Sequence, residues 1–197
     1  MKHKYTRHLG SLALAAMMST ASGTILLGPI TNPANGHLYY LLDESTWQGG
    51  EASAISLGGH LVTINDALEN AWVFNTFNSF WGVNYSLWIG FYESGAEGNY
   101  VWSSNESVTF TYWEPSEPTN SNGVEAYAHM FSANDGRGSQ WNDLGSPNIN
   151  SPQVNPLASV VEVIPEPSAA ILLLSGAALC FRRRSLRTHE RSRRVQK

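Results

Sequence analysis

The chain has 197 residues, of which 42% are hydrophobic and 14% are charged, and its formal net charge is −4. The charges are segregated: residues 24–164 contain fourteen of the sixteen acidic residues but one of the twelve basic residues, Arg137, and therefore carry −13. A body this acidic repels nucleic acid and anionic lipid and attracts divalent cations, so we expect no nucleic-acid partner. The single cysteine, Cys180, excludes an intrachain disulfide.

Residues 1–23 have the composition of an export signal. A basic start (MKHKYTRH) precedes an apolar run (LGSLALAAMM) and small residues (STASG) that suit cleavage. The apolar run is shorter than the roughly 20 residues that a membrane-spanning helix needs. This order predicts a signal peptide, and hence an exported protein, with a buried N-terminal helix as the alternative.

The next segment predicts two strands and two helices. The aromatic and aliphatic run HLYYLL, residues 37–42, predicts the first strand of the body. Thr46 can then cap a helix that a Gly-Gly pair ends, and HLVTI at 60–64 predicts a short strand. Asn65 or Asp66 can cap the second helix, ALENAWVFNTF, whose apolar residues recur on one side.

Further along, short β-rich runs are separated by Gly, Ser and Asn turns. SLWIGF at 86–91, NYVWSS at 99–104 and VTFTYW at 108–113 predict strands, and LASVVEVI at 157–164 predicts a closing strand. Residues 114–134 show no period, and a loop this long in a compact domain is usually functional. Helices first and strands afterwards predict an α+β domain.

Six landmarks in this body occur in the order and spacing of the C-type lectin-like domain: TWQGGEASAISLGGHLVTI, LWIGF, EGNYVW, YWEPSEPTN, VEAYAHM and WNDL. They extend from Gly36 to about Val163, and we place the domain at residues 24–163. The resemblance implies an α+β, C-type lectin-like fold with two helices, short antiparallel sheets and a long ligand loop. The body lacks the disulfides that many members of the family have.

The resemblance also implies a calcium site. In sugar-binding members of the family, five side chains hold one Ca²⁺, and in the family the proline that corresponds to Pro118 is cis. Three carboxylates against one divalent ion, with amide and hydroxyl oxygens beside them, make a donor set that suits Ca²⁺. By position, the resemblance assigns the five ligands to Glu117, Thr119, Glu125, Asn142 and Asp143.

Two neighbouring hydroxyls of a sugar can complete the coordination of such an ion. The resemblance therefore gives the carbohydrate-binding residues as Glu117, Thr119, Asn120, Glu125, Asn142 and Asp143. Glu-Pro at the start of this motif resembles the mannose- or glucose-type motif rather than the galactose-type Gln-Pro-Asp. Thr119 departs from the expected asparagine, and Asn120 replaces it as a ligand if the loop shifts by one residue.

Other polar and aromatic residues receive simpler predictions. Glu69 and Glu93 resemble positions that hold auxiliary Ca²⁺ in the family. Trp88 and Trp141 are predicted in the core, whereas Trp113 fits the core or a sugar-stacking role. Five further residues are predicted to be solvated acids or structural histidines rather than ligands: Glu106, Glu114, Asp135, His60 and His129.

Residues 164–197 resemble the PEP-CTERM sorting tail. They contain Pro-Glu-Pro at 165–167, a short apolar helix at 169–181 and an arginine cluster at 182–184. The resemblance implies processing by an exosortase in a Gram-negative bacterium, commonly one that makes exopolysaccharide, with the helix transiently in the inner membrane. The alternative is an ordinary single-span anchor, and in both cases the acidic body lies outside.

These features predict an exported cell-surface or extracellular protein that binds carbohydrate, of mannose or glucose type or an exopolysaccharide, through Ca²⁺. The alternative is a lectin-like fold used for protein or matrix contact, with a metal site that has degenerated at Thr119. Glu117 and Glu125 could be imagined as paired glycosidase acids. No nucleophile motif, phosphate-binding loop or histidine-rich cluster accompanies them, so we do not expect an enzyme.

Overall fold

The computed structural model describes residues 23–43, 46–145 and 157–166. The predicted signal peptide, apart from residue 23, and the predicted tail helix at 169–181 lie outside this part of the chain. Within it, no helix combines the length and the apolar composition needed to cross a membrane.

Two helices and ten strands are present in the described residues. The helices are α1 (Trp47–Ser56) and α2 (Ala67–Phe77), and two 3₁₀ turns are η1 (Ser121–Gly123) and η2 (Ala133–Asp135). The strands are β1 (Ile25–Thr31), β2 (Leu38–Leu42), β3 (His60–Leu61), β4 (Ser79–Phe80), β5 (Val83–Asn84), β6 (Ser86–Glu93), β7 (Tyr100–Trp102), β8 (Tyr127–Met130), β9 (Trp141–Leu144) and β10 (Leu157–Val163). The α+β prediction is confirmed.

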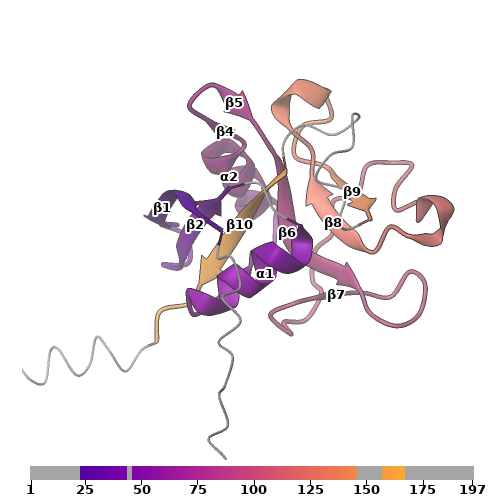
Figure 1. The fold of residues 1–197 in the computed structure, drawn as a ribbon, viewed down its shortest axis with the longest axis horizontal. Coiled ribbons are helices and arrows are strands. Elements are labelled where there is room, and N and C mark those ends of the chain that lie inside the picture. Colours follow the sequence, from indigo (N-terminus) through magenta and orange to yellow (C-terminus); the bar gives the residue numbers. More distant parts are fainter. Residues whose placement is uncertain (1–22, 44–45, 146–156, 167–197) are drawn as a thin grey trace, which may run out of the picture.

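One sheet of eight strands organises the molecule (Figure 1). Its main path runs β1-β2-β10-β6-β8-β9, with β3 paired to β10 and β7 paired to β6. The last strand, β10, lies in the middle, antiparallel to β2 and parallel to β6. A separate hairpin consists of β4 and β5.

Both helices begin where a side chain can cap them. The hydroxyl of Thr46 accepts a hydrogen bond from Gly49 N at 3.1 Å, as predicted for α1. Of the two candidates for α2, Asp66 is the cap: its Oδ1 accepts from Leu68 N at 2.8 Å and from Glu69 N at 2.9 Å.

The core is built largely from aromatic rings. Trp88 and Trp141 are fully buried, as predicted, and Trp102 is 1% exposed. Phe91 lies between Trp102 and Trp141, with ring centroids 4.4 Å and 5.7 Å away. Trp113 is partly buried and packs against this cluster, which favours the core for that residue. An aromatic core of this kind stabilises the fold without disulfides.

The structure corrects two strand predictions. β1 precedes HLYYLL, so the predicted first strand is the second. VTFTYW, predicted as a strand, forms none: Trp113 makes an isolated bridge to Trp141 and Tyr112 O accepts from Trp141 N at 2.8 Å, but no ladder extends along the run. Alternating residues of high strand propensity form a strand only where a neighbouring edge is available.

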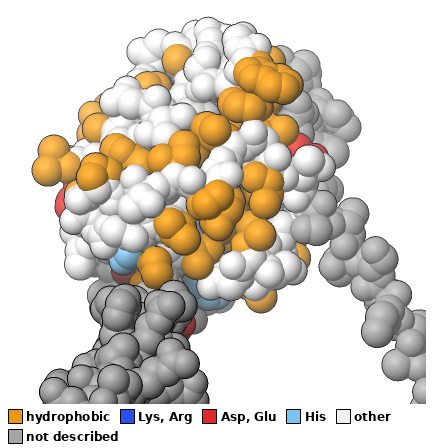
Figure 2. Space-filling model, turned by 90° about the vertical axis from the view of Figure 1, so that its left-hand side faces the viewer, with side chains coloured by type: hydrophobic (Ala, Val, Ile, Leu, Met, Phe, Trp, Pro, Cys, Tyr) orange, Lys and Arg blue, Asp and Glu red, His pale blue; other side chains and the backbone are white. Residues whose placement is uncertain are grey.

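β1 is an edge strand, and the side of the molecule that carries it has both hydrophobic and polar surface. Figure 2 shows several clusters of hydrophobic side chains on that face and no Lys or Arg side chain among its described residues. Pro29 within β1 removes one backbone donor from the open edge, which makes pairing with another chain less favourable.

We expect Asp66→Ala to lower the free energy of unfolding by about 1 kcal/mol, because two N-terminal amides of α2 lose their acceptor. Urea unfolding followed by circular dichroism measures the change. Asp66→Asn keeps a capping oxygen and is the control. Equal losses in both variants would contradict a capping role.

Candidate functional site

The candidate site is formed by the loop between β7 and β8 together with β9. Asp143, on β9, is fully buried, although it is a carboxylate. Its Oδ1 accepts from Thr119 N at 3.0 Å and its Oδ2 from Asn120 N at 2.7 Å. The hydroxyl of Tyr100 donates to the same Oδ2 at 3.3 Å. One buried carboxylate therefore fixes the loop to the sheet.

Glu125 closes the loop from its other end. Its Oε2 accepts from Ser121 N at 2.7 Å and from the hydroxyl of Thr119 at 3.4 Å. Its own backbone N–H donates to Asn120 Oδ1 at 3.0 Å. The structure thus brings together Thr119, Asn120, Glu125 and Asp143 through direct hydrogen bonds.

Glu117 lies beside this group but is not satisfied by it. Its Oε2 is buried and has no hydrogen-bond partner among the described residues. The peptide bond from Glu117 to Pro118 is cis, as the resemblance implied. A buried carboxylate oxygen without a donor is costly, and a cation would satisfy it.

Burial, with the charge of neighbouring carboxylates, raises the pKa of Glu117 and of Glu125. Burial raises the pKa of Glu117 above its ordinary value, a hydrogen bond from Thr119 opposes the rise, and the neighbouring Asp143 and Glu125 add to it. Burial likewise raises the pKa of Glu125, and Asp143 contributes. Both shifts mean that negative charge is unfavourable here in the absence of a cation.

No described Lys or Arg neutralises this group. Arg137, the one basic residue in the described part of the chain, lies over the ring of Phe131, 4.2 Å from its centroid. The ion pairs among the described residues are His37–Glu162 and His60–Glu51. The donor set therefore fits a hard divalent cation: carboxylate, amide and hydroxyl oxygens with an excess of negative charge.

Both carboxylate oxygens of Asp143 already accept hydrogen bonds from backbone amides of the loop. No three His, Cys, Asp or Glu side chains in the described ranges are arranged closely enough to hold a metal ion as they stand. A cation would have to replace some of these amide contacts.

Asn142, the fifth predicted ligand, bonds within the sheet through its Nδ2. Its Nδ2 lies 3.2 Å from His129 Nε2, and His129 Nδ1 lies 3.2 Å from Met130 O. Because a carbonyl can only accept, Nδ1 carries the proton and Nε2 accepts from Asn142. No hydrogen bond joins the side chain of Asn142 to the described loop residues 117–125. His129 is structural, as predicted, and it also orients Asn142.

Two residues of the site were missed by the sequence reasoning. Glu97 accepts a hydrogen bond from Asn120 Nδ2, and Tyr100 donates to Asp143. Burial raises the pKa of the Tyr100 hydroxyl, and the charge of Asp143 adds to the rise, so Tyr100 stays a donor. Both lie in the landmark EGNYVW, whose spacing before the loop was the available signal.

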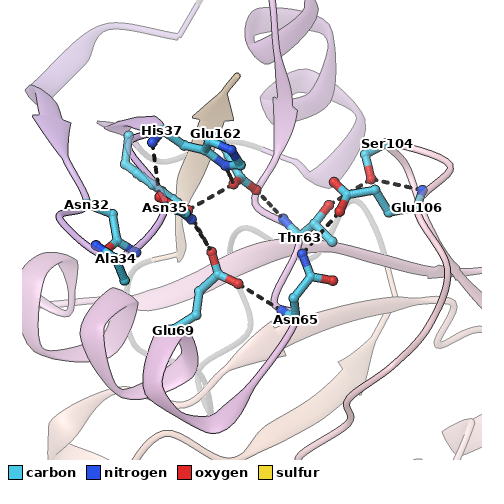
Figure 3. Close-up of polar contacts among 11 residues, drawn as sticks. Asn32, Ala34, Asn35, His37, Thr63, Asn65, Glu69, Ser104, Glu106 and Glu162 are labelled. Atoms are coloured by element: carbon cyan, nitrogen blue, oxygen red, sulfur yellow. Dashed lines mark hydrogen bonds and ion pairs between the residues drawn. The ribbon is translucent and has the colours of Figure 1, made fainter. Parts of the chain in front are cut away.

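A second group of buried carboxylates, remote in sequence, lies under α2 (Figure 3). The hydroxyl of Tyr39 is 2.6 Å from Glu69 Oε1 and 2.8 Å from Glu162 Oε1. Glu69 also accepts from Asn35 Nδ2 and Asn65 N, and His37 Nδ1 lies 2.6 Å from Glu162. Burial raises the pKa of Glu162, against the hydrogen bonds from His37 and Tyr39. This network joins β2, α2 and β10.

The remaining predicted residues have local partners. Glu93, predicted as an auxiliary calcium position, accepts from Gly98 N in the turn between β6 and β7. Glu106 accepts from Asn65 Nδ2 at 3.0 Å, and Asp135 forms a capping box with Ser132. Both were predicted to be solvated acids, and both have a protein partner as well. His60 and Glu114 are also paired locally, with Glu51 and Ser116 respectively.

We expect His129 to cost the calcium-free protein stability as the pH falls from about 6.5 to about 4, a contribution that the raised pKa values of Glu117, Glu125 and Glu162 oppose. Burial lowers the pKa of His129 from its ordinary value of 6.5 to about 4, so in this window the unfolded chain binds a proton that the folded chain refuses. Urea unfolding at pH 7 and pH 5 measures the loss. His129→Gln, which does not titrate, should lose less than the wild type, and equal losses would contradict the assignment.

Comparisons with known proteins agree with this architecture. A family model of the Lectin C-type domain matches residues 43–150, more than half of the chain. Lectin BRA-3 from Megabalanus rosa is 35% identical over 89 residues, which are 44% of this chain and 52% of that protein. The perlucin-like protein from Mytilus galloprovincialis is 27% identical over 143 residues, 69% of this chain and 89% of its own length.

A third relative and a solved structure complete the comparison. The alpha-N-acetylgalactosamine-specific lectin from Patiria pectinifera is 35% identical over 103 residues, 52% of this chain and 60% of that lectin. The chain thus spans between about half and two thirds of the length of this lectin and of lectin BRA-3. The C-type lectin CEL-I from Cucumaria echinata superposes with a TM-score of 0.55 at 26% identity, covering 66% of this chain and 91% of that one. The chain belongs to the C-type lectin domain family.

Proposed function

We propose that this chain is an exported protein that binds carbohydrate through a Ca²⁺ ion held between the loop at 117–125 and β9. The observation that carries the proposal is the gathering of Glu117, Glu125 and Asp143 without a described cation. Burial raises the pKa values of Glu117 and Glu125, and one buried oxygen of Glu117 has no donor.

The residues of the site would have two roles, as ligands of the ion and as hydrogen-bond acceptors for the sugar. Glu117, Glu125, Asn142 and Asp143 offer side-chain oxygens to the ion, and the bound ion supplies a charged centre on which two neighbouring sugar hydroxyls can be placed. The same carboxylates accept hydrogen bonds from those hydroxyls. Such sites are shallow, and several copies of the site together give useful affinity.

Thr119 is a better candidate than Asn120 for the fifth ligand. The Oδ1 of Asn120 already accepts from Glu125 N at 3.0 Å, and its Nδ2 donates to Glu97, so both ends of that amide support the loop. The hydroxyl of Thr119 faces Glu125 at 3.4 Å, on the side of the carboxylates. A shift of the loop by one residue would break both contacts of Asn120.

The sugar class follows from the motif. Glu117 keeps the Glu-Pro start of the mannose- or glucose-type motif, which favours these sugars or an exopolysaccharide that contains them. One relative is named for specificity toward N-acetylgalactosamine, which supports a carbohydrate ligand in general. We propose no catalytic role for Glu117 and Glu125, because a metal site already accounts for them.

The ends of the chain supply the proposed location. We propose a signal peptide at 1–23, a lectin domain at 24–163 and a sorting tail at 164–197 that an exosortase processes in a Gram-negative bacterium. The strong acidity of 24–164 supports a body that faces outward and draws divalent cations from the medium.

A second function is favoured by the hydrogen bonds of Asp143. Both of its oxygens accept loop amides, and these hydrogen bonds tie the loop to β9 through protein groups alone. This supports the alternative, a lectin fold used for protein or matrix contact. The two functions differ in whether calcium displaces these amides.

We expect isothermal titration calorimetry to detect uptake of one Ca²⁺ per chain, and Glu117→Gln to weaken it at least about tenfold, because the ion loses a carboxylate. Glu114→Gln is the matched control: Glu114 lies three residues away and bonds to Ser116. Binding that is equal in both variants, or absent in the wild type, would refute the site.

We also expect Thr119→Asn to bind Ca²⁺ about tenfold more tightly than the wild type, because an amide carbonyl reaches further than a hydroxyl. Thr119→Val, which removes the hydroxyl and keeps the shape, should bind more weakly. If neither variant changes the affinity, Thr119 is not a ligand.

A glycan array probed with and without Ca²⁺ separates the two functions. For a calcium-dependent lectin we expect binding to mannose- or glucose-containing glycans that EGTA abolishes. Calcium uptake without any glycan signal would instead support the contact function.

A further inference from the structure

The turn of the β4–β5 hairpin contains a tryptophan whose backbone is strained and whose side chain is exposed. Its two-residue turn is Trp81-Gly82, with φ of +48° and +79°, a geometry in which Asn-Gly is the common choice. A bulky side chain at positive φ strains the backbone. The indole of Trp81 is nevertheless 92% exposed, so it gains little from burial. A residue that is both strained and unburied points to a role outside folding.

The ring of Trp81 lies nearly parallel to one aromatic neighbour and stays almost fully exposed. Phe80 stacks on it with an interplanar angle of 11° and a centroid distance of 5.1 Å, and Phe80 itself packs against the main core. The base of the hairpin is fixed by Asn78, which donates to Tyr85 O at 2.8 Å and accepts from Tyr85 N at 2.7 Å. The result is an exposed aromatic ring on a hairpin whose base is fixed.

Size and charge restrict what can bind this plane. Residues 79–84 carry no charge and the body carries −13, which disfavours nucleic acid and anionic lipid. A stable protein interface needs about 800 Å² on each partner, far more than one indole and the partly exposed Val83 provide. A single ring fits the area, and a neutral pyranose carries C–H groups that pack on the negative face of an indole.

We infer that Trp81 is a stacking platform for a pyranose ring of a neutral oligosaccharide, forming a subsite separate from the calcium loop. The inference rests on the proposed function for its ligand class, but it needs no metal. The hairpin lies apart from β9 in Figure 1 and precedes the loop at 117–125 by more than thirty residues, so the two sites can bind different rings of one chain.

Nuclear magnetic resonance of the indole N–H groups tests the platform. The protein is titrated with cellohexaose in EGTA, which removes the contribution of the calcium site. This probe is flat, and both faces of its rings carry axial C–H groups. We expect the Trp81 signal, assigned by its loss in Trp81→Asn, to shift with a dissociation constant on the order of 1 mM.

The variants separate stacking from folding. Asn tolerates the positive φ, so Trp81→Asn should melt no lower than the wild type while binding of the probe weakens at least about tenfold. Trp81→Phe keeps a ring and should retain part of the affinity. Leu68→Ser, which removes an apolar side chain that is 80% exposed on α2, is the control and should bind as the wild type does.

Three results would overturn the inference: no shift of the Trp81 signal, a shift with phosphatidylcholine vesicles but not with cellohexaose, or equal binding by Trp81→Asn and the wild type. Each is independent of the calcium site, because EGTA is present throughout. Loss of calcium uptake in calorimetry, with the Trp81 shift intact, would remove the proposed metal site and leave the platform.

Discussion

The carboxylate of Asp143 is buried in a sheet strand, where an ion is stable only if hydrogen bonds replace the water it has lost. Those bonds come from the amides of Thr119 and Asn120 and from Tyr100. Trp141, two residues earlier on β9, is fully buried in the aromatic core, so the strand cannot move to relieve the charge. The loop must therefore come to the carboxylate, and its conformation follows from that requirement.

This arrangement makes the loop amides and a divalent cation competitors for the same oxygens. With amides bound, Asp143 is satisfied, but Glu117 and Glu125 are left with raised pKa values. With a divalent cation bound, two of the three negative charges would be neutralised, at the expense of two hydrogen bonds. Charge favours the cation and loop geometry favours the amides, and the balance between them decides which of the two proposed functions the protein has.

Local signals in the sequence predicted the elements that local physics controls. Thr46 and Asp66 cap helices because their own oxygens reach amides two or three residues away. The prediction of a strand at 108–113 was wrong because a strand also needs a neighbouring strand to pair with, and local sequence does not specify that neighbour.

The candidate site was predicted only in part, because sequence patterns identify residues that are close along the chain and not those brought together by folding. Its landmark residues are close in sequence, whereas the tie from Tyr39 to Glu69 and Glu162 joins residues 30 and 123 positions apart and has no sequence pattern. Trp81 was missed because nothing in the letters FWG distinguishes an exposed ring from a buried one. Only the backbone angle and the exposure of that ring revealed it.

The place of β10 in the sheet has a consequence for how the chain matures. Because this strand lies between β2 and β6, the two halves of the sheet have no direct ladder until residues 157–163 arrive. Contacts of such long sequence separation form slowly, since a large loop must close before they contribute. In a nascent chain these two halves of the sheet would thus stay unjoined until residues 157–163 have been synthesised.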